Sequence, residues 1–176
     1  MKIIIASDIH GSLRYTKKLE ELINKENPDT IILLGDLLYH GARNALPEEY
    51  STMEVANILN KYSDKIVAVR GNCDSDVDIK VSDFPIINEL GILSINGKDI
   101  YLTHGHIYNE NNWQKSNSIL VYGHLHIPFI KEKDGNYYIN PGSISLPKNN
   151  TKNSYLIIND SEIILTLDKI EDEILK

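Results

Sequence analysis

Two histidines stand two residues apart just beyond an apolar run, where they could hold a metal ion. The run is Ile119 to Tyr122, and Gly123-His124-Leu125-His126 follows it. In extended backbone, residues i and i+2 point to the same side, so we expect both imidazoles to face one small volume. Histidine pairs of this kind are common metal ligands. Alone, the pair is equally well explained as two polar residues in a loop.

Four other short apolar runs also end in residues that can bind metals. In chain order these residues are Asp8 with His10, Asp36, Asn72, and His104. One such strand end is ordinary, because Asp and Asn favour turns; a repeat at strand after strand is not. Together with His124 and His126 they are too many ligands for one ion and suit two that share a carboxylate, for which Asp36 is the natural choice.

This mixture of oxygen and nitrogen ligands without thiolate suits Mn²⁺, Fe or Zn²⁺ in a reactive site, and does not suit a structural zinc site. Two metal ions roughly 3.5–4 Å apart typically clamp a phosphoryl group and hold a hydroxide between them as the nucleophile. The set therefore predicts direct hydrolysis of a phosphate ester. In that scheme Asp36, Asn72 and His104 are the expected catalytic residues, and no general acid is assigned.

Four further side chains are candidates for substrate contact. They are His40, Arg43, Cys73 and His106. Arg43 would suit a phosphate best through its planar fork, although an ordinary surface arginine explains it equally well. His106 shares a face with His104, where it could instead support that ligand or face solvent. Cys73 is expected to line the site rather than to act as a nucleophile.

The first third of the sequence predicts a strand–helix–strand unit. Ile3–Ala6 and Thr30–Leu34 are apolar strands, and a helix is expected between them from Leu13 to Glu26, with Ser12 as its N-cap. The two strands should be parallel, which brings their carboxyl ends to one sheet edge. Open α/β sheets bind ligands at that edge.

A second helix is expected to begin near Pro47 and to lead to a third strand, Ile66–Val69. Beyond it the sequence favours short strands joined by turns. Hairpin turns are expected at Asn96-Gly97 and Asp134-Gly135, and a further turn at Asn159–Ser161. The fold class is therefore α/β.

The chain has 176 residues, 41% of them apolar and 24% charged, which predicts one domain over residues 1–176. Its 18 basic and 25 acidic residues give a net charge of −7, which argues against a nucleic-acid polymer but not against a small phosphate ester. Cys73 is the only cysteine, and no apolar run has the length of a signal peptide or membrane span. We expect a cytoplasmic protein with no membrane partner; a homo-oligomer, dimer or tetramer, stays open.

Five motifs, in this order, resemble those of the calcineurin-like metallophosphoesterase superfamily. They are Asp8-Ile9-His10, Gly35-Asp36, Gly71-Asn72, His104-Gly105-His106 and Gly123-His124-Leu125-His126. Three more stretches resemble the small YfcE-type bacterial phosphodiesterases. These are Gly71-Asn72-Cys73-Asp74, His40-Gly41 with Arg43-Asn44-Ala45-Leu46-Pro47, and Asn140-Pro141-Gly142-Ser143. The resemblance runs from residue 1 to about residue 168.

The resemblance implies a four-layer αββα sandwich, with an N-terminal βαβαβ half followed by a mainly antiparallel β half. It assigns one metal ion to Asp8, His10 and His126 and the other to Asn72, His104 and His124, with Asp36 bridging. Family members are usually Mn²⁺-dependent, so Mn²⁺ is expected, with Zn²⁺, Fe, Ni²⁺ or Co²⁺ as alternatives. The implied function is hydrolysis of small phosphodiesters at a dinuclear centre.

Cys73 occupies a position where many superfamily members carry a histidine that is thought to support the leaving group or the transition-state charge. A thiol is a poor substitute for imidazolium at neutral pH. A diester with a good leaving group needs an acid less than an alkyl monoester does, so Cys73 mildly favours diesters.

Two other functions stay open. A retromer subunit that resembles this fold is a scaffold without catalysis, so the fold alone does not decide activity. The presence of all the expected ligands speaks against that role here. A nuclease with the same metal core would need a basic groove and extra capping segments, which this acidic, compact chain does not show.

Overall fold

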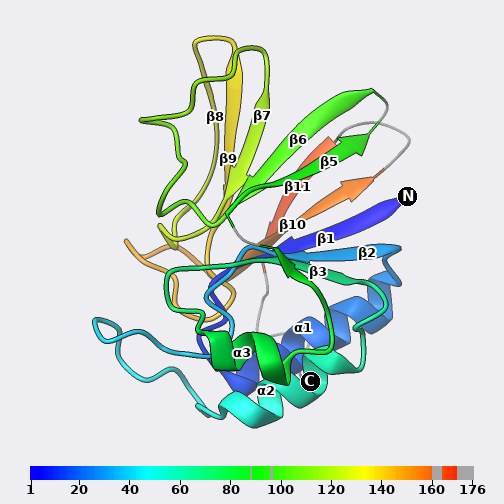
Figure 1. Cartoon of the computed structure of the whole chain (residues 1–176), viewed down its shortest axis with the longest axis vertical. Helices are drawn as coiled ribbons and strands as arrows, with labels where there is room; N and C mark the ends of the chain where they lie inside the picture. The colour runs from blue at the N-terminus through cyan, green and yellow to red at the C-terminus, as the bar shows by residue number, and fades with distance from the viewer. Residues whose placement is uncertain (88, 96, 160–163, 170–176) are drawn as a thin grey trace.

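Two β-sheets lie face to face, and the helices pack against the outer side of the first (Figure 1). The structure is a computed structural model that describes residues 1–87, 89–95, 97–159 and 164–169. The first sheet has the order β11-β10-β1-β2-β3-β4, with β1 to β4 parallel and β10 antiparallel to both β1 and β11. Its strands are β1 (Lys2–Ala6), β2 (Thr30–Leu33), β3 (Ile66–Val69), β4 (Ile86–Ile87), β10 (Ser154–Asn159) and β11 (Ile164–Lys169).

The second sheet is mixed, with the order β5-β6-β7-β9-β8. Its strands are β5 (Gly91–Ile95), β6 (Lys98–Thr103), β7 (Ile119–Tyr122), β8 (Pro128–Lys133) and β9 (Asn136–Pro141). The hairpins β5–β6 and β8–β9 are antiparallel, as predicted, whereas β7 is parallel to both β6 and β9. This parallel pairing matters for the site, because it brings the carboxyl ends of β6 and β7 to the same edge.

Of the two predicted hairpin turns, the structure describes one fully and the other in part. Asp134-Gly135 joins β8 to β9 with φ of 52° and 74°, the conformation that a two-residue hairpin turn requires. Gly97, with φ of 76°, joins β5 to β6, while its partner Asn96 lies outside the described residues. The turn expected at 159–161 also falls there, since residues 160–163 are not described.

Helix α1 (Leu13–Glu26) has the predicted bounds, and the Ser12 side chain accepts a hydrogen bond from the Tyr15 backbone at its start. Helix α2 (Thr52–Asn60) begins later than predicted, and the expectation near Pro47 is wrong. The reason is tertiary: Leu13 N donates to the Glu49 carbonyl and Ser51 N donates to the Gly11 carbonyl. These bonds tie residues 49–51 to the loop after β1, with Glu49 in left-handed backbone that a helix cannot include.

A short third helix, α3 (Asp76–Val81), was not predicted. Ser75 and Asp78 start it with a capping box, in which each side chain accepts from the other residue's backbone N–H. None of the helices among the described residues is both long and apolar enough to cross a membrane.

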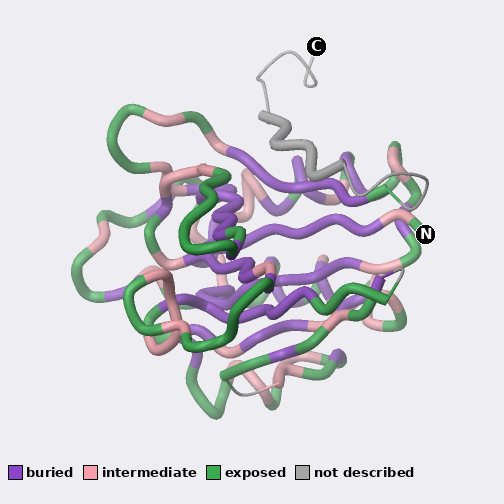
Figure 2. The backbone as a smooth tube through the Cα atoms, turned by 90° about the horizontal axis from the view of Figure 1, so that it is seen from above, coloured by how far each residue is buried: buried purple, intermediate pink, exposed green. Residues whose placement is uncertain are grey.

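Three apolar clusters stack through the molecule, and buried backbone runs through its centre (Figure 2). One lies between the first sheet and the helices, and the second lies between the two sheets. The third covers the outer face of the second sheet, where Trp113 packs on the Tyr101 ring with centroids 5.0 Å apart. The α/β sandwich is therefore confirmed, but no helix of the described residues covers the outer face of the second sheet, where Trp113 of the helix-free segment 104–118 packs instead.

Candidate metal centre

Loops from both sheets meet at the carboxyl ends of their parallel strands. The loops after β1 and β2 are joined by two backbone hydrogen bonds, Asp8 N to the Gly35 carbonyl and His10 N to the Asp36 carbonyl. Across the sandwich, the parallel pair β6–β7 sets the residues after Thr103 beside those after Tyr122. The seven predicted ligands all lie in these loops or in the loop after β3.

The first group of side chains combines Asp8, His10 and His126, all buried. His10 Nε2 lies 3.2 Å from His126 Nε2, and Asp8 Oδ1 lies 3.2 Å from His126 Nε2 and 3.7 Å from His10 Nε2. Three potential ligand atoms from two distant parts of the chain therefore face one another.

The second group combines His104, Asn72 and His124. His104 Nε2 lies 3.0 Å from Asn72 Oδ1 and 3.2 Å from His124 Nδ1. His104 is fully buried, while Asn72 is exposed and His124 is half-buried. This group therefore lies at the mouth of the site, nearer to solvent than the first.

Asp36 lies between the two groups. Its Oδ2 is 3.7 Å from His10 Nε2 and 3.4 Å from His104 Nε2, while its Oδ1 accepts a hydrogen bond from Cys73 N at 2.8 Å. One carboxylate oxygen is thus fixed by the protein, and the other is within reach of both histidine groups. This is the arrangement that a bridging carboxylate needs.

The hydrogen bonds of three imidazoles indicate which nitrogen faces the site. The Nδ1 atoms of His10, His104 and His126 lie 2.9, 2.6 and 2.6 Å from the carbonyl oxygens of Tyr39, Leu34 and Leu146. A carbonyl oxygen only accepts, so each Nδ1 carries the proton and a neutral ring leaves a lone pair on Nε2. Such backbone partners orient histidine ligands in metal sites.

This donor set fits a cation. With both Nδ1 atoms protonated, the Nε2 lone pairs of His10 and His126 oppose each other at 3.2 Å unless a positive charge lies between them. Asp8 Oδ1 is buried and accepts no hydrogen bond within the described part of the chain, although its Oδ2 accepts from Ser7 Oγ and His124 N. A buried oxygen without a donor is costly, and a bound cation would satisfy it.

The ligand loops use left-handed backbone, which the sequence did not predict. Asp8, His10, Asp36, His124 and His126 have φ between 52° and 65°. The backbone at these positions is therefore not extended as expected, although Asp8 and His10 still face the same group. His124 contacts His104 in the second group, whereas His126 contacts His10 in the first.

Two glycines let the loops approach the carboxylates closely. A Cβ on Gly123 would collide with Ser7 Oγ and come 2.7 Å from Asp8 Oδ2. A Cβ on Gly71 would collide with Asp36 Oδ1. Glycine at positions 71 and 123 therefore leaves space for the carboxylates of Asp36 and Asp8.

Several supporting residues have no role predicted from the sequence. Ser143 Oγ and Ser145 Oγ both donate to the Asp8 carbonyl, at 2.7 and 2.9 Å. Asn140 Nδ2 donates to the Gly123 carbonyl at 2.7 Å. The Asn140–Ser143 stretch, noted above for its resemblance alone, thus fixes the backbone on either side of the first group.

Asp74 is a positioning residue. Its carboxylate accepts from the backbone N–H groups of Asp36, Leu37 and Gly71 at 2.7–2.8 Å. It therefore holds the loop after β2 against the loop after β3, which keeps Asp36 beside Asn72.

A cavity of about 720 Å³ opens over the centre, and the four substrate-contact candidates relate to it differently. Arg43 and Cys73 line it, together with Lys148, for which no role was predicted. His106 lines a neighbouring concavity with Asn72, and its ring is 5.3 Å from that of His104. His40 does not line the cavity, because it packs between the rings of Tyr39 and Tyr50.

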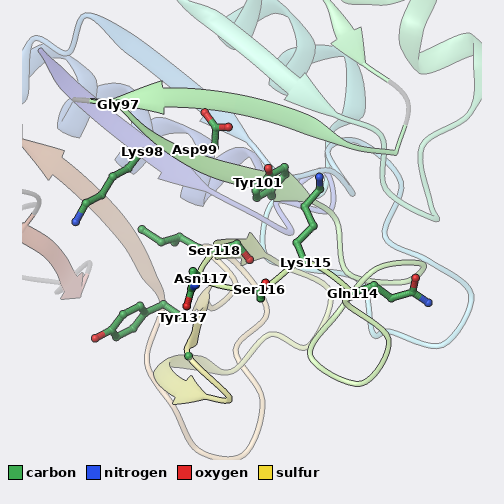
Figure 3. Close-up of a pocket in the computed structure, with 12 residues that line it drawn as sticks. Gly97, Lys98, Asp99, Tyr101, Gln114, Lys115, Ser116, Asn117, Ser118 and Tyr137 are labelled. Atoms are coloured by element: carbon green, nitrogen blue, oxygen red, sulfur yellow. The ribbon is translucent and has the colours of Figure 1, made fainter.

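Another concavity, of about 680 Å³, lies at the amino ends of β6 and β7, away from the candidate metal centre (Figure 3). Its lining includes Lys98 at the start of β6 and Ile119 at the start of β7. It contains none of the seven predicted ligands, so the candidate site is the one at the carboxyl ends.

The charges of the centre are strongly coupled. Burial lowers the pKa of His104, but its hydrogen bond to Asp36 and the charges of Asp8 and Asp36 outweigh burial and raise this pKa to about 9. Burial raises the pKa of Asp36, but His104 and the Cys73 N–H hold it well below its ordinary value. Burial and the charge of His104 lower the pKa of His124 to about 4.

These shifts predict pH-dependent metal affinity. A metal ion at His104 must displace its proton, so we expect Mn²⁺ affinity to rise by about tenfold per pH unit between pH 6.5 and 8.5. Stability of the metal-free protein should show the opposite sign, since the raised pKa of His104 stabilises the fold below pH 6.5 and this contribution is lost as the pH rises through about 9. Calorimetric titrations at three pH values measure the first effect, and His104→Asn should flatten it. Equal affinity across the range would contradict the assignment of His104.

Known proteins resemble this chain both in sequence and in fold. The calcineurin-like phosphoesterase superfamily domain matches residues 1–162. The phosphodiesterase YfcE of Escherichia coli is 41% identical over 170 residues, which cover 95% of this chain and 92% of YfcE. The solved structure of YfcE has a TM-score of 0.87 and 37% identity, covering 97% of this chain and all of that one. A Vps29 variant from Entamoeba histolytica shares the fold at a TM-score of 0.64 and 23% identity, covering 98% and 94% of the two chains.

Proposed function

The chain belongs to the calcineurin-like phosphoesterase superfamily, a family of phosphoric ester hydrolases, and we propose that it hydrolyses small phosphodiesters at a centre of two divalent metal ions. The family match confirms the resemblance drawn from the five sequence motifs. The observation that supports the proposal best is the pair of donor groups on either side of Asp36, the first of them wholly buried. The 41% identity to the phosphodiesterase YfcE supports diesters as the substrates.

In this proposal Asp8, His10 and His126 hold one ion and Asn72, His104 and His124 hold the other. Asp36 contributes to both through Oδ2. Mn²⁺ is the expected metal, and the donor set also suits Zn²⁺, Fe, Co²⁺ or Ni²⁺. When bound, such ions polarise a phosphoryl group and lower the pKa of an attacking water.

The residues around the cavity then bind and orient the ester. Arg43 and Lys148 bring two positive charges to a cavity that would receive a phosphate anion. Cys73 N–H keeps Asp36 oriented, and the Cys73 thiol accepts a hydrogen bond from Asn72 Nδ2 at 3.2 Å. In the metal-free protein, burial and the charge of Asp36 raise the pKa of this thiol to about 12, which keeps it protonated at pH 7 and disfavours it as a nucleophile.

The proposal is tested by hydrolysis of bis(p-nitrophenyl) phosphate by the purified protein. We expect activity that rises with Mn²⁺, disappears in EDTA and returns when Mn²⁺ is restored. Phenyl phosphate, a monoester, should be the poorer substrate. Protein that stays inert with Mn²⁺, Co²⁺, Ni²⁺ and Zn²⁺ would overturn the proposal.

A scaffold role is the second candidate, since a Vps29 protein shares the fold. A scaffold needs neither paired donor groups nor a cavity lined by Arg43 and Lys148. Metal binding without any turnover in the assay above would favour this candidate over the enzyme.

Cys73→Ala is expected to slow diester hydrolysis only modestly, by less than about fivefold, because the neutral thiol neither attacks nor donates its proton at pH 7. The more informative change is Cys73→His, which adds an imidazole to the lining of the cavity and should raise the rate on monoesters relative to diesters. Steady-state kinetics on one diester and one monoester measure both effects. Complete inactivation of Cys73→Ala would show that the thiol has a larger part in the reaction.

Three broader expectations accompany this proposal. The chain forms one domain over residues 1–176, it works in the cytoplasm, and its substrate is a small ester rather than a nucleic-acid polymer or a membrane lipid. The single cysteine supports a cytoplasmic location, and the net charge of −7 supports a small ester as the substrate. A dimer or tetramer is compatible with all three.

A further inference from the structure

An apolar groove of about 350 Å³ runs beside the metal centre. Its walls come from the loop after β2, the start of α2 and the exposed side of α3. The large apolar side chains Tyr39, Met53 and Val77 line it and are 43%, 54% and 64% exposed. Three exposed apolar side chains that line one groove mark a binding site more strongly than a single exposed one does.

The groove continues into the cavity over the metal centre. Tyr39, Cys73 and Ser75 line both concavities. Tyr39 links the groove to the metal centre, because it lines both concavities and its carbonyl oxygen accepts a hydrogen bond from His10 Nδ1. A molecule held by its phosphoryl group at the centre would therefore extend one end into the groove.

The charges around the groove restrict what this end can be. No Lys or Arg lines it among the described residues, so the groove does not suit a second phosphate or carboxylate. Its one charged side chain, Asp78, is engaged, because its carboxylate accepts from Ser75 N at 2.7 Å. The positive charges of Arg43 and Lys148 lie on the cavity side.

We propose that the groove formed by Tyr39, Met53 and Val77 binds one uncharged, apolar or aromatic ester arm of the substrate. The inference rests on the function proposed above and adds the class of substrate: diesters with at least one such arm. The volume of about 350 Å³ suits a single aromatic ring with its substituents.

The test compares two ligands that carry the same charged group and differ in one arm. Phenylphosphonate and methylphosphonate are titrated calorimetrically into the Mn²⁺-loaded protein, and neither is turned over, so the measurement does not depend on catalysis. We expect phenylphosphonate to bind about tenfold more tightly, a preference of roughly 1.4 kcal/mol. In the double variant Met53→Ser/Val77→Ser this preference should fall below about twofold, with methylphosphonate affinity unchanged.

A matched control is Ile92→Ser on β5 of the second sheet, whose side chain is 60% exposed and lies outside the groove. It should keep the tenfold preference. Equal binding of the two phosphonates to the unaltered protein, or an undiminished preference in the double variant, would overturn the groove assignment alone. Failure of both phosphonates to bind would overturn the metal-site function together with it.

Discussion

Asp36→Ala is expected to abolish phosphodiester hydrolysis, with kcat/KM falling by at least about 1,000-fold. The reason is positional: among the described residues, Asp36 Oδ2 is the carboxylate oxygen that lies within 3.7 Å of histidines in both groups. Its removal takes a ligand from both proposed ions and leaves His104 without the partner that raises its pKa. Metal content by elemental analysis should fall in parallel with the rate.

The control for this change is Asp64→Ala, which removes an exposed aspartate that follows α2. It should leave both rate and metal content unchanged. Because Asp36 Oδ1 also fixes Cys73 N, circular dichroism should verify that the Asp36→Ala protein is folded. Turnover near that of the unaltered protein would reject Asp36 as the shared ligand.

Gly123→Ala should inactivate the enzyme by about 100-fold or more without removing any ligand. The new methyl group would occupy the position of Ser7 Oγ and press on Asp8 Oδ2, so the Asp8 carboxylate must move out of the first group. Overpacking of this kind typically costs about 1–3 kcal/mol of stability. Kinetics together with chemical denaturation of the metal-free protein measure both losses.

Gly97→Ala is the matched control, because a Cβ there meets nothing within 4 Å. Gly97 has φ of 76°, so alanine should cost about 1 kcal/mol of backbone strain and leave the rate unchanged. If both alanine variants lost stability equally and both stayed active, the steric account of Gly123 would be wrong.

The sequence predicted the strands and the strand-end residues because both depend on local patterns. Apolar β-branched runs stop abruptly at polar residues, so the places of His104 and His124 at strand ends could be inferred from neighbours in the chain. The start of α1 could likewise be inferred from Ser12, its N-cap. The parallel pairing of β6 with β7, which brings those two histidines together, depends on a connection of 15 residues and leaves no local pattern.

Other features could not be predicted because they depend on hydrogen bonds to backbone groups far away in the sequence. The start of α2 is fixed by hydrogen bonds from Leu13 and Ser51 to residues far away in the chain. Lys148 lies at the cavity because Lys148 N donates to the His126 carbonyl, a contact that nothing in the surrounding sequence suggests. Left-handed backbone at the ligand positions was likewise missed, whereas the resemblance had already assigned His124 and His126 to different metal ions.

The left-handed backbone at the ligand positions lowers the stability of the fold while it places the side chains that the proposed chemistry needs. Asp8, His10, Asp36, His124 and His126 adopt a conformation that costs a side chain roughly 1 kcal/mol or more each, and that glycine or asparagine adopts more readily. At His126 the buried Nδ1–H that donates to the Leu146 carbonyl offsets this cost, so an exchange there would lose that hydrogen bond together with a proposed ligand. Aspartate or histidine stands at all five positions, and each of the five is a proposed metal ligand.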